Sequence, residues 1–423
     1  MPASRESMSA PKGARRRHSL KSKIFAGKAE WIIALLLLAY PLLGTLIAFT
    51  SLPSLVGSVP VRALVLLLSL ALIYHTKRTV WATTGARLMF AFWSMYLIRL
   101  LWDWWVVGIP VGGEFTLNFV AFCIPTAMAM MHAPVLDERK LGRQLSVMGA
   151  VTCLLAIIAA NSNLAGVRSG TDNFAGGRLF LDTVNPITYG HVGVTTLLAA
   201  LSMMRYCSRA IEWAGVVAAA ALGFTLIQIA GSRGPLVALV VCIITVALLD
   251  KRYRYLLLPL IAGGLLLFGG STEDSQSVLA SRVTESTQND NPEVRILMIA
   301  GAFGQFIDSP LIGSSIIEQQ FEDYPHNPFI EAAMALGIGG LLFLGTINVK
   351  AIKRIVRELR HGSLLVPLLA VQALVGAQVS GAISASASMW MFLALYAGAV
   401  EKTSGRKRMA HTNATQRSQL EIE

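Results

Sequence analysis

Apolar stretches of about 15–22 residues, separated by shorter polar segments, recur along the chain from Trp31 to Val400. At about 1.5 Å of rise per residue, helices of this length can cross the hydrocarbon core of a bilayer. The last stretches are the least regular, because the segment from Gly376 to Ser388 is rich in small polar residues and fits a broken or re-entrant helix. The pattern predicts an all-α polytopic membrane protein, with one transmembrane domain over residues 31–400 and about twelve crossings. The predicted spans are 31–50, 60–74, 88–108, 115–131, 144–160, 186–204, 211–230, 235–249, 255–270, 328–349, 364–380 and 382–400.

The polar connections fall into two groups that alternate along the chain. Those rich in Lys and Arg are 75–87, 132–143, 205–210, 250–254 and 350–362. Since Lys and Arg accumulate on the cytoplasmic side of a membrane, these connections are predicted to lie inside. Residues 1–30 then form a basic cytoplasmic tail, and residues 401–423 a polar tail expected to be disordered on the same side. Two outer loops, 161–185 and 271–327, are long enough to carry function.

Composition excludes several other classes of protein. Hydrophobic residues make up 54% of the chain and charged residues 14%, which is not the balance of a soluble domain. The net charge of +12 comes from Lys and Arg placed beside apolar stretches, where they orient helices and meet anionic lipid head groups, so no nucleic-acid partner is predicted. Cys123, Cys153, Cys207 and Cys242 lack metal or disulfide spacing and are predicted to be small buried hydrophobes.

Three predicted helices begin at the outer face with the same two-residue pattern. Asn185-Pro186, Gly234-Pro235 and Asn327-Pro328 each place a capping residue before a proline at the first helical position. Their unpaired N–H groups and positive dipole ends would face the outer leaflet, which suits an anion such as phosphate. A fourth start, Asn291-Pro292, opens a stretch to about residue 307 that is short for a crossing and is predicted to lie along the interface.

Cationic and titratable side chains accompany these helix starts. Outer loops are normally poor in arginine, yet the topology places Arg168, Arg178, Arg233 and Arg295 outside, and His326 stands where a loop meets a helix. Taken singly, each arginine fits an ordinary interfacial anchor and the histidine an ordinary capping side chain. Together they suit glycosyl transfer from a polyprenyl pyrophosphate, with arginines holding the diphosphate and histidine taking the proton of an acceptor hydroxyl.

Several motifs resemble the O-antigen ligase and O-antigen polymerase superfamily of bacterial inner membranes. The resemblance covers about residues 160 to 345. Its motifs are GSRGPLVAL at 231–239, Arg295, DSPLIG at 308–313, HNPFIE at 326–331 and LGIGG at 336–340, with GR at 177–178, NP at 185–186 and YG at 189–190.

The resemblance implies a metal-independent, inverting glycosyltransferase without a cofactor, on a GT-C-like helical fold whose long periplasmic loop contains short helices. His326 would be the base, and Arg178 and Arg233 would bind the undecaprenyl pyrophosphate of the donor. Arg295 would do likewise or position the loop. Asn327 would cap its helix, orient the imidazole and contribute to the substrate site. Arg168 is a further, less well aligned candidate.

Several alternatives remain open at this point. Bilayer lipids and an undecaprenyl pyrophosphate glycan are the predicted partners, and the acceptor is either lipid A core, for a ligase, or a lipid-linked glycan, for an O-antigen, capsule or exopolysaccharide polymerase. A transporter or flippase of lipid-linked sugar is the alternative class. Glu318 and Glu322 would share a face and offer a cation site if their stretch were helical. Helix dipole and arginines favour a neutral His326, whereas Glu318, Glu322 and Asp323 favour its charged form.

Overall fold

The computed structural model describes residues 28–50, 55–76, 83–133, 136–161, 179, 184–256 and 292–398, and most of these residues are helical. The isolated β-bridge between Glu318 and Asp323 joins two of these residues. The predicted tails lie outside the described residues, except for residues 28–30. The same is true of most of the loop 161–185, residues 271–291 and most of the predicted span 255–270.

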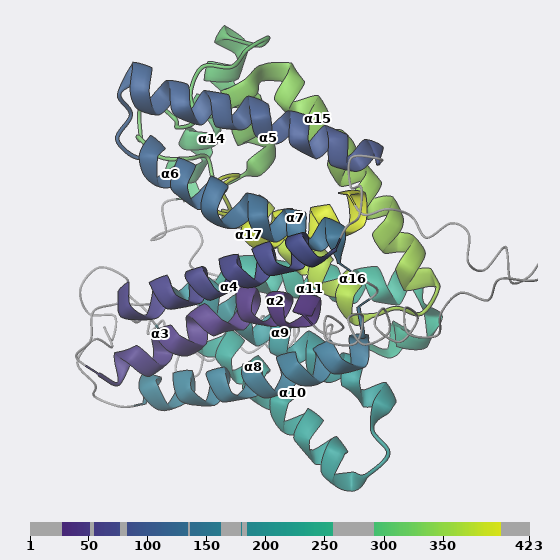
Figure 1. Cartoon of the computed structure of the whole chain (residues 1–423). Helices are drawn as coiled ribbons and strands as arrows, with labels where there is room; N and C mark the ends of the chain where they lie inside the picture. The colour runs from purple at the N-terminus through teal and green to yellow at the C-terminus, as the bar shows by residue number, and fades with distance from the viewer. Residues whose placement is uncertain are drawn as a thin grey trace, which may run out of the picture.

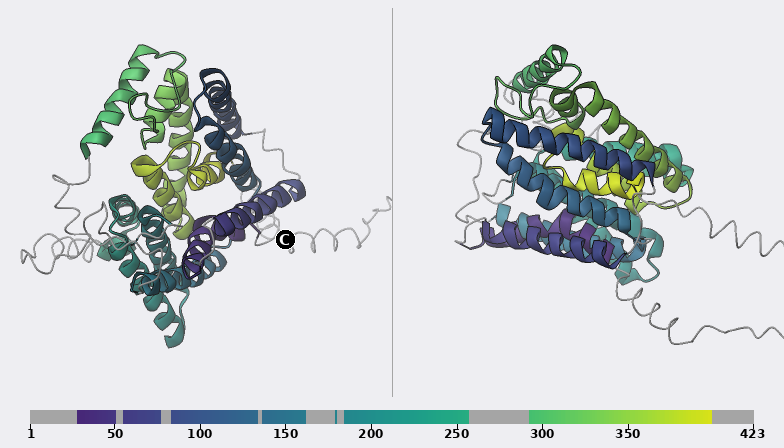
Figure 2. Two further views of the ribbon diagram at one scale, coloured as in Figure 1. Left: turned by 90° about the vertical axis from the view of Figure 1, so that its left-hand side faces the viewer. Right: turned by 45° about the horizontal axis from the view of Figure 1, so that its top comes forward.

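The helices pack side by side, with α5, α14 and α15 in one part of the bundle and α3, α4, α8, α9 and α10 in the other (Figure 1). In the second view of Figure 2 the helices drawn in purple and blue run roughly parallel to one another. The helices are α2 (Lys28–Ala34), α3 (Tyr40–Ala48), α4 (Leu55–His75), α5 (Thr84–Trp102), α6 (Gly112–Asn118), α7 (Ile124–His132), α8 (Glu138–Ala160), α9 (Pro186–Met203), α10 (Ala210–Ala230), α11 (Arg233–Leu249), α14 (Pro292–Asp308), α15 (Pro328–Arg360), α16 (Leu365–Ser380) and α17 (Ala387–Leu393). Short π-helical segments are η1 (Leu35–Ala39), η3 (Asp103–Val107), η4 (Phe119–Cys123) and η9 (Ala394–Gly398), and short 3-10 segments are η5 (Met204–Tyr206) and η6 (Lys251–Leu256).

Six of the described helical stretches are long and apolar enough to cross a membrane, and four shorter apolar helices accompany them. The six are Ala29–Ala48, Gly112–His132, Glu138–Ala160, Pro186–Tyr206, Ala210–Ala230 and Pro328–Arg360. The prediction of an all-helical, multi-pass membrane protein is thereby supported, while the number of crossings and the side of each loop stay predictions. The short helix predicted after Asn291 is present as α14.

One predicted connection is wrong. Residues 350–362 were expected to form a basic loop, but α15 continues to Arg360. The lysines and arginines therefore lie on the last turns of a 33-residue helix, where cationic side chains also interact favourably with the C-terminal end of the helix dipole. Charge alone marks a segment that stays out of the hydrocarbon core, and it does not decide whether the backbone remains helical there.

α15 is broken at Gly337, and the loop that precedes α15 packs against this break. Gly337 adopts φ 66° and ψ −157°, a conformation essentially confined to glycine. Because the helix opens there, the N–H of Ile338 is free to donate to the carbonyl of Pro310 at 2.8 Å, and the N–H of Ser314 donates to the carbonyl of Met334 at 2.8 Å. The sequence motifs at 308–313 and 336–340 therefore pack against each other.

The described part of the chain between α16 and α17 is non-helical over residues 381–386, as the small polar composition there suggested. Two buried groups hold this break. The backbone N–H of Ile383 donates to Glu331 on α15 at 2.8 Å, and the indole N–H of Trp390 donates to the carbonyl of Ile383 at 2.7 Å. Trp390 also packs against Phe92 of α5, with ring centroids 5.4 Å apart, so the break is fixed to the aromatic core.

Candidate functional site

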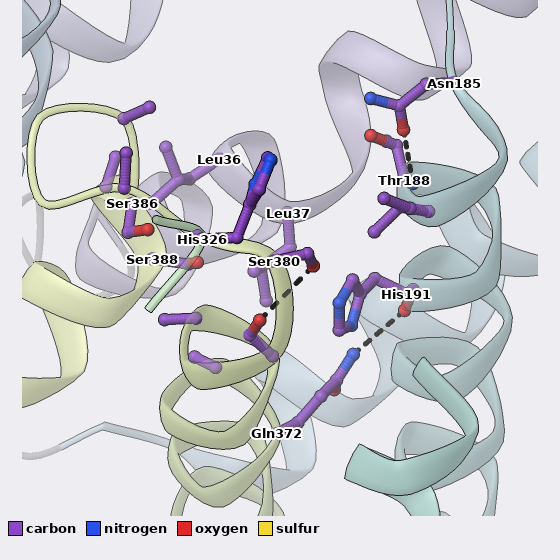
Figure 3. A pocket seen from close by; sticks show the side chains of 18 of the residues that line it. Leu36, Leu37, Asn185, Thr188, His191, His326, Gln372, Ser380, Ser386 and Ser388 are labelled. Atoms are coloured by element: carbon purple, nitrogen blue, oxygen red, sulfur yellow. Dashed lines mark hydrogen bonds between the residues drawn. The ribbon is translucent and has the colours of Figure 1, made fainter. Parts of the chain in front are cut away.

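A cavity of about 440 Å³ opens between the start of α9, the end of α16, the break before α17 and the loop that precedes α15. This volume lies in the range of small-molecule binding pockets. His326 and Arg295 both line it, so the structure brings together two side chains that lie 31 positions apart in the sequence. Figure 3 shows His326 beside Ser380 and Ser386, with Asn185 and His191 across the cavity. The remaining polar lining residues are Thr188, Thr195, Tyr324, Gln372 and Ser388.

His326 has a strained backbone, with φ at +54°. A side chain rarely adopts this left-handed conformation unless the surroundings impose it, and such strain is often found at functional sites. The Tyr324 ring packs edge-on against the imidazole, with centroids 4.4 Å apart. Nδ1 is buried and has no hydrogen-bond partner among the described residues, and Nε2 lies 3.9 Å from a carboxylate oxygen of Asp323. The ring is therefore held in place while neither of its nitrogens is hydrogen-bonded to a described residue.

The protonation of His326 follows from three neighbouring influences. Burial is the largest and lowers the pKa of the imidazole below its ordinary value of 6.5; the Asp323 carboxylate raises the pKa, and the Arg295 guanidinium lowers it. The net result is a lowered pKa, so the imidazole is neutral near pH 7. The competition between cations and carboxylates expected from the sequence is therefore decided mainly by burial, in favour of a ring able to accept a proton.

The loop that carries His326 is tied to the bundle at several points. Besides its contacts with the break in α15, the N–H of Ile316 donates to a carboxylate oxygen of Asp103 at 2.8 Å. The other oxygen of Asp103 forms an ion pair with Arg99, four residues earlier on the same helical face, at 3.0 Å. Asp103 is fully buried, so this pair also secures the loop to the end of α5.

Asn327 joins the loop to two helices. Its side-chain oxygen accepts from the N–H groups of Phe329 at 3.0 Å and Ile330 at 3.2 Å, which confirms the predicted cap of α15. Its side-chain amide donates to the carbonyl of Gln378 near the end of α16 at 3.1 Å. Both ends of the side chain are therefore bound to the protein, which supports a positioning role for the residue beside the imidazole, while a direct substrate contact stays a prediction.

Replacing Asn327 by alanine should lower the free energy of unfolding by about 1–2 kcal/mol, since the cap is lost, and should also lower activity, because the adjacent imidazole loses its support. Thermal unfolding and turnover of the purified protein would measure the two effects. Asp137→Ala is the matched control: it removes the cap of α8, where Asp137 accepts from Lys140. It should cost similar stability with activity kept. Equal loss of activity in both variants would contradict the positioning role.

Glu331 is a further buried group one turn into α15. It is fully buried, and its carboxylate accepts from the Tyr96 hydroxyl of α5 and from the N–H of Ile383. One side chain thus links α5, α15 and the break between α16 and α17, which forms a wall of the cavity. The residue stands inside the HNPFIE motif, but the sequence shows neither partner, because both are far away along the chain.

Of the other three arginines predicted to bind the anion, the described residues include only Arg233. Arg233 is the first residue of α11 and does not line the cavity, although its neighbour Gly234 approaches Val379 and Ser380 at the end of α16, and Ser380 does line it. Arg168 and Arg178 lie outside the described residues. The structure therefore joins His326 with Arg295, and sets Arg233 on an adjoining helix start.

The stretch containing Glu318 and Glu322 is a turn, so the helical face proposed for a cation site does not exist. The Glu318 carboxylate accepts from the N–H groups of Gln320 at 3.0 Å and Phe321 at 2.8 Å. Glu318 and Asp323 pair through their backbones, with an N–H to O distance of 2.8 Å. Within the described residues no three His, Cys, Asp or Glu side chains gather closely enough to hold a metal ion.

Sequence reasoning missed the polar residues deeper in the cavity, chiefly His191, Thr195 and Gln372. A signal was available, since an ionisable or amide side chain inside a predicted membrane span is costly and commonly functional. His191 and Gln372 lie inside the predicted spans 186–204 and 364–380. What the sequence did not show is that these two helices face one another.

The fold and the cavity define a class: a helical, multi-pass membrane protein in which a neutral imidazole and a guanidinium line one cavity between the helices. Residues 218–345 match the family model described as O-antigen ligase, which confirms the predicted relationship to the O-antigen ligase and polymerase superfamily. The match includes Arg233, Arg295, His326 and Glu331, and it supports an activity of that general type on lipid-linked glycans. A search of curated proteins found no match to the chain.

Proposed function

We propose that the protein transfers a glycan from undecaprenyl pyrophosphate to an acceptor hydroxyl, at the periplasmic side of a bacterial inner membrane and with both termini in the cytoplasm. The observation that supports this most directly is the joint lining of one cavity by His326 and Arg295. A neutral imidazole can remove a proton, and a guanidinium can hold a diphosphate through paired hydrogen bonds. These are the two functions that the reaction requires of side chains.

In the proposed reaction the acceptor oxygen attacks the anomeric carbon from the face opposite the diphosphate. A new C–O bond forms as the bond to the diphosphate oxygen breaks, so the configuration inverts. The acceptor proton passes to His326, and the leaving electron pair stays on undecaprenyl diphosphate. Arg295 stabilises the charge that develops there, and Arg178, Arg233 and Arg168 are proposed to assist. No divalent metal is required in this scheme, because the guanidinium groups take its place.

The proposed acceptor is lipid A core, which makes the protein an O-antigen ligase. The alternative within the superfamily is a polymerase that extends a second lipid-linked unit. The assay is reconstitution in liposomes with undecaprenyl pyrophosphate glycan and either rough lipopolysaccharide or a second lipid-linked unit. Glycan on the lipopolysaccharide supports the ligase, whereas chain extension alone would overturn it in favour of the polymerase. Activity should survive chelator, and a loss restored by magnesium would contradict the metal-free reaction.

Replacing Arg295 by glutamine should reduce kcat/KM by about 10- to 100-fold, because one charged hydrogen-bonding group to the diphosphate is lost. Lysine at the same position should recover part of the loss, since it restores charge without the planar fork. Arg62→Gln is the matched control, because Arg62 is an exposed arginine that bonds Asn118 at 3.5 Å and does not line the cavity. Activity in Arg295→Gln equal to that of the control would argue against a diphosphate contact.

Polar side chains within predicted spans, His191 and Gln372 among them, are also what a lipid-linked sugar transporter would need. The same liposomes separate the two classes. Movement of the lipid-linked glycan across the bilayer, without transfer to any acceptor, would overturn the enzyme and favour the transporter.

A further inference from the structure

The cavity changes character with depth. Arg295 and His326 come from α14 and from the loop before α15, near the ends of their elements. Thr195 lies nine residues into α9, and Gln372 lies eight residues before the end of α16. At about 1.5 Å per residue, both are roughly 12–14 Å from the helix ends that frame the opening. Among the described lining residues, this deeper part carries no charge.

His191, Thr195 and Gln372 form the deep polar part, which we call the floor. The Gln372 side-chain amide donates to the His191 carbonyl at 2.9 Å and to the Thr195 hydroxyl at 3.0 Å, so the floor joins α9 to α16. His191 and Thr195 are four residues apart and share one face of α9. Gln372 is 4% exposed, so its amide is fixed by these bonds.

The His191 imidazole has room beside α16 because Gly376 has no side chain. A Cβ at position 376 would come within 2.6 Å of the ring. Neither ring nitrogen hydrogen-bonds to any described residue, and the ring lines the cavity (Figure 3). His191 is only partly buried and its nitrogens are not among the buried atoms that lack a partner, so they are open to a ligand or water in the cavity.

The chemistry of the floor suits a neutral ligand with many hydroxyl groups. Imidazole, hydroxyl and amide groups both donate and accept hydrogen bonds, as sugar hydroxyls do. A phosphate would instead call for cationic partners, and the described floor has none. Apolar side chains also line the cavity, namely Leu36, Leu37, Phe122 and Leu369, and these can pack on the C–H face of a sugar ring.

We propose that His191, Thr195 and Gln372 form a subsite for a neutral sugar ring, in which the His191 imidazole hydrogen-bonds a sugar hydroxyl. This rests on the proposed function, in which the diphosphate and the attacked carbon lie at the opening beside Arg295 and His326. The ring belongs either to the donor glycan or to the acceptor. The shared chemistry is the hydroxyl-bearing ring, and kinetics distinguishes the two sources.

The kinetic test compares His191→Phe, which keeps a flat ring but removes both nitrogens, with Gly376→Ala, which displaces the imidazole. Each should raise the KM of one substrate about tenfold with a smaller change in kcat, as expected for a lost ground-state hydrogen bond. A raised donor KM assigns the ring to the donor, and a raised acceptor KM assigns it to the acceptor. The control is His132→Phe, since His132 bonds the Met128 carbonyl and does not line the cavity. Unchanged KM values for both substrates in His191→Phe would overturn the subsite.

A binding test works without turnover. In a Cys207→Ser background, where the remaining cysteines are buried, His191→Cys would be labelled with a methanethiosulfonate ethylammonium reagent. Undecaprenyl pyrophosphate glycan or rough lipopolysaccharide should slow labelling at least about tenfold, and sugar-free undecaprenyl pyrophosphate should not. The subsite would be overturned if only the sugar-free lipid slowed labelling, or if neither glycan did. It would also be overturned if His191→Cys were not labelled at all. Protection by a glycan in a protein that performs no transfer would instead count against the proposed function and leave the subsite standing.

Discussion

Replacing His326 by asparagine is expected to reduce glycan transfer by about 10²- to 10⁴-fold, the usual contribution of a general base, with little change in the free energy of unfolding. Asparagine suits this experiment because it tolerates the left-handed backbone that His326 adopts, with φ at +54°. Alanine tolerates it less well, so its effect would mix lost chemistry with lost stability. Turnover in liposomes and thermal unfolding in detergent would be measured on the same preparation. A folded His326→Asn protein with full activity would refute the catalytic assignment.

The same assay has an expected pH dependence. A base must be neutral to act, and burial lowers the pKa of His326 below 6.5. Activity should therefore rise with pH through a midpoint below 6.5 and be level near neutrality. Since the Asp323 carboxylate raises that pKa, Asp323→Asn should move the rising limb to lower pH. An asparagine side chain still offers the oxygen that accepts from the N–H of Tyr324, so the turn is preserved. An unmoved limb would show that another group titrates.

Replacing Gly337 by alanine is expected to destabilise the protein by about 3 kcal/mol or more. Strain at a conformation confined to glycine costs about 1–3 kcal/mol, and overpacking costs about as much again. The conformation is φ 66° and ψ −157°, and a Cβ there would lie 2.5 Å from the carbonyl oxygen of Pro310 and 2.7 Å from the carbonyl carbon of Leu311. The break would close or the loop would leave it, so activity should fall as well. Chemical or thermal unfolding together with turnover would measure both effects.

Gly345→Ala is the matched control on the same helix. A Cβ added at Gly345 would meet no neighbouring atom within 4 Å, and alanine is the better helix former by about 1 kcal/mol. This variant should be as stable as the parent or more stable, with activity kept. If Gly337→Ala behaved like Gly345→Ala, the docking of the loop on the break in α15 would not be what holds His326 in place.

Hydropathy predicted most of the helices, since the apolar spans that fall on described residues coincide with helices, apart from residues 382–386 at the start of the last span. The cap at Asn327 was also predicted correctly, because it depends on residues within one turn of each other. The error at residues 350–362 came from equating charge with a loop. The break between α16 and α17 followed from its small polar residues, but its attachment to Glu331 did not.

By itself the sequence determined that this chain is a multi-pass membrane protein and which residues have chemistry to offer, because hydrophobic length, charge placement and capping are local properties of the chain. The tertiary structure alone decided which of those residues meet. It placed His326 and Arg295 on the lining of one cavity, and burial there keeps the imidazole neutral. It also placed His191 and Gln372, which lie 181 positions apart in the sequence, in contact on the lining of the same cavity. Contacts of that kind depend on how helices pack against one another, and a helix carries the same hydropathy pattern whichever neighbour it packs against.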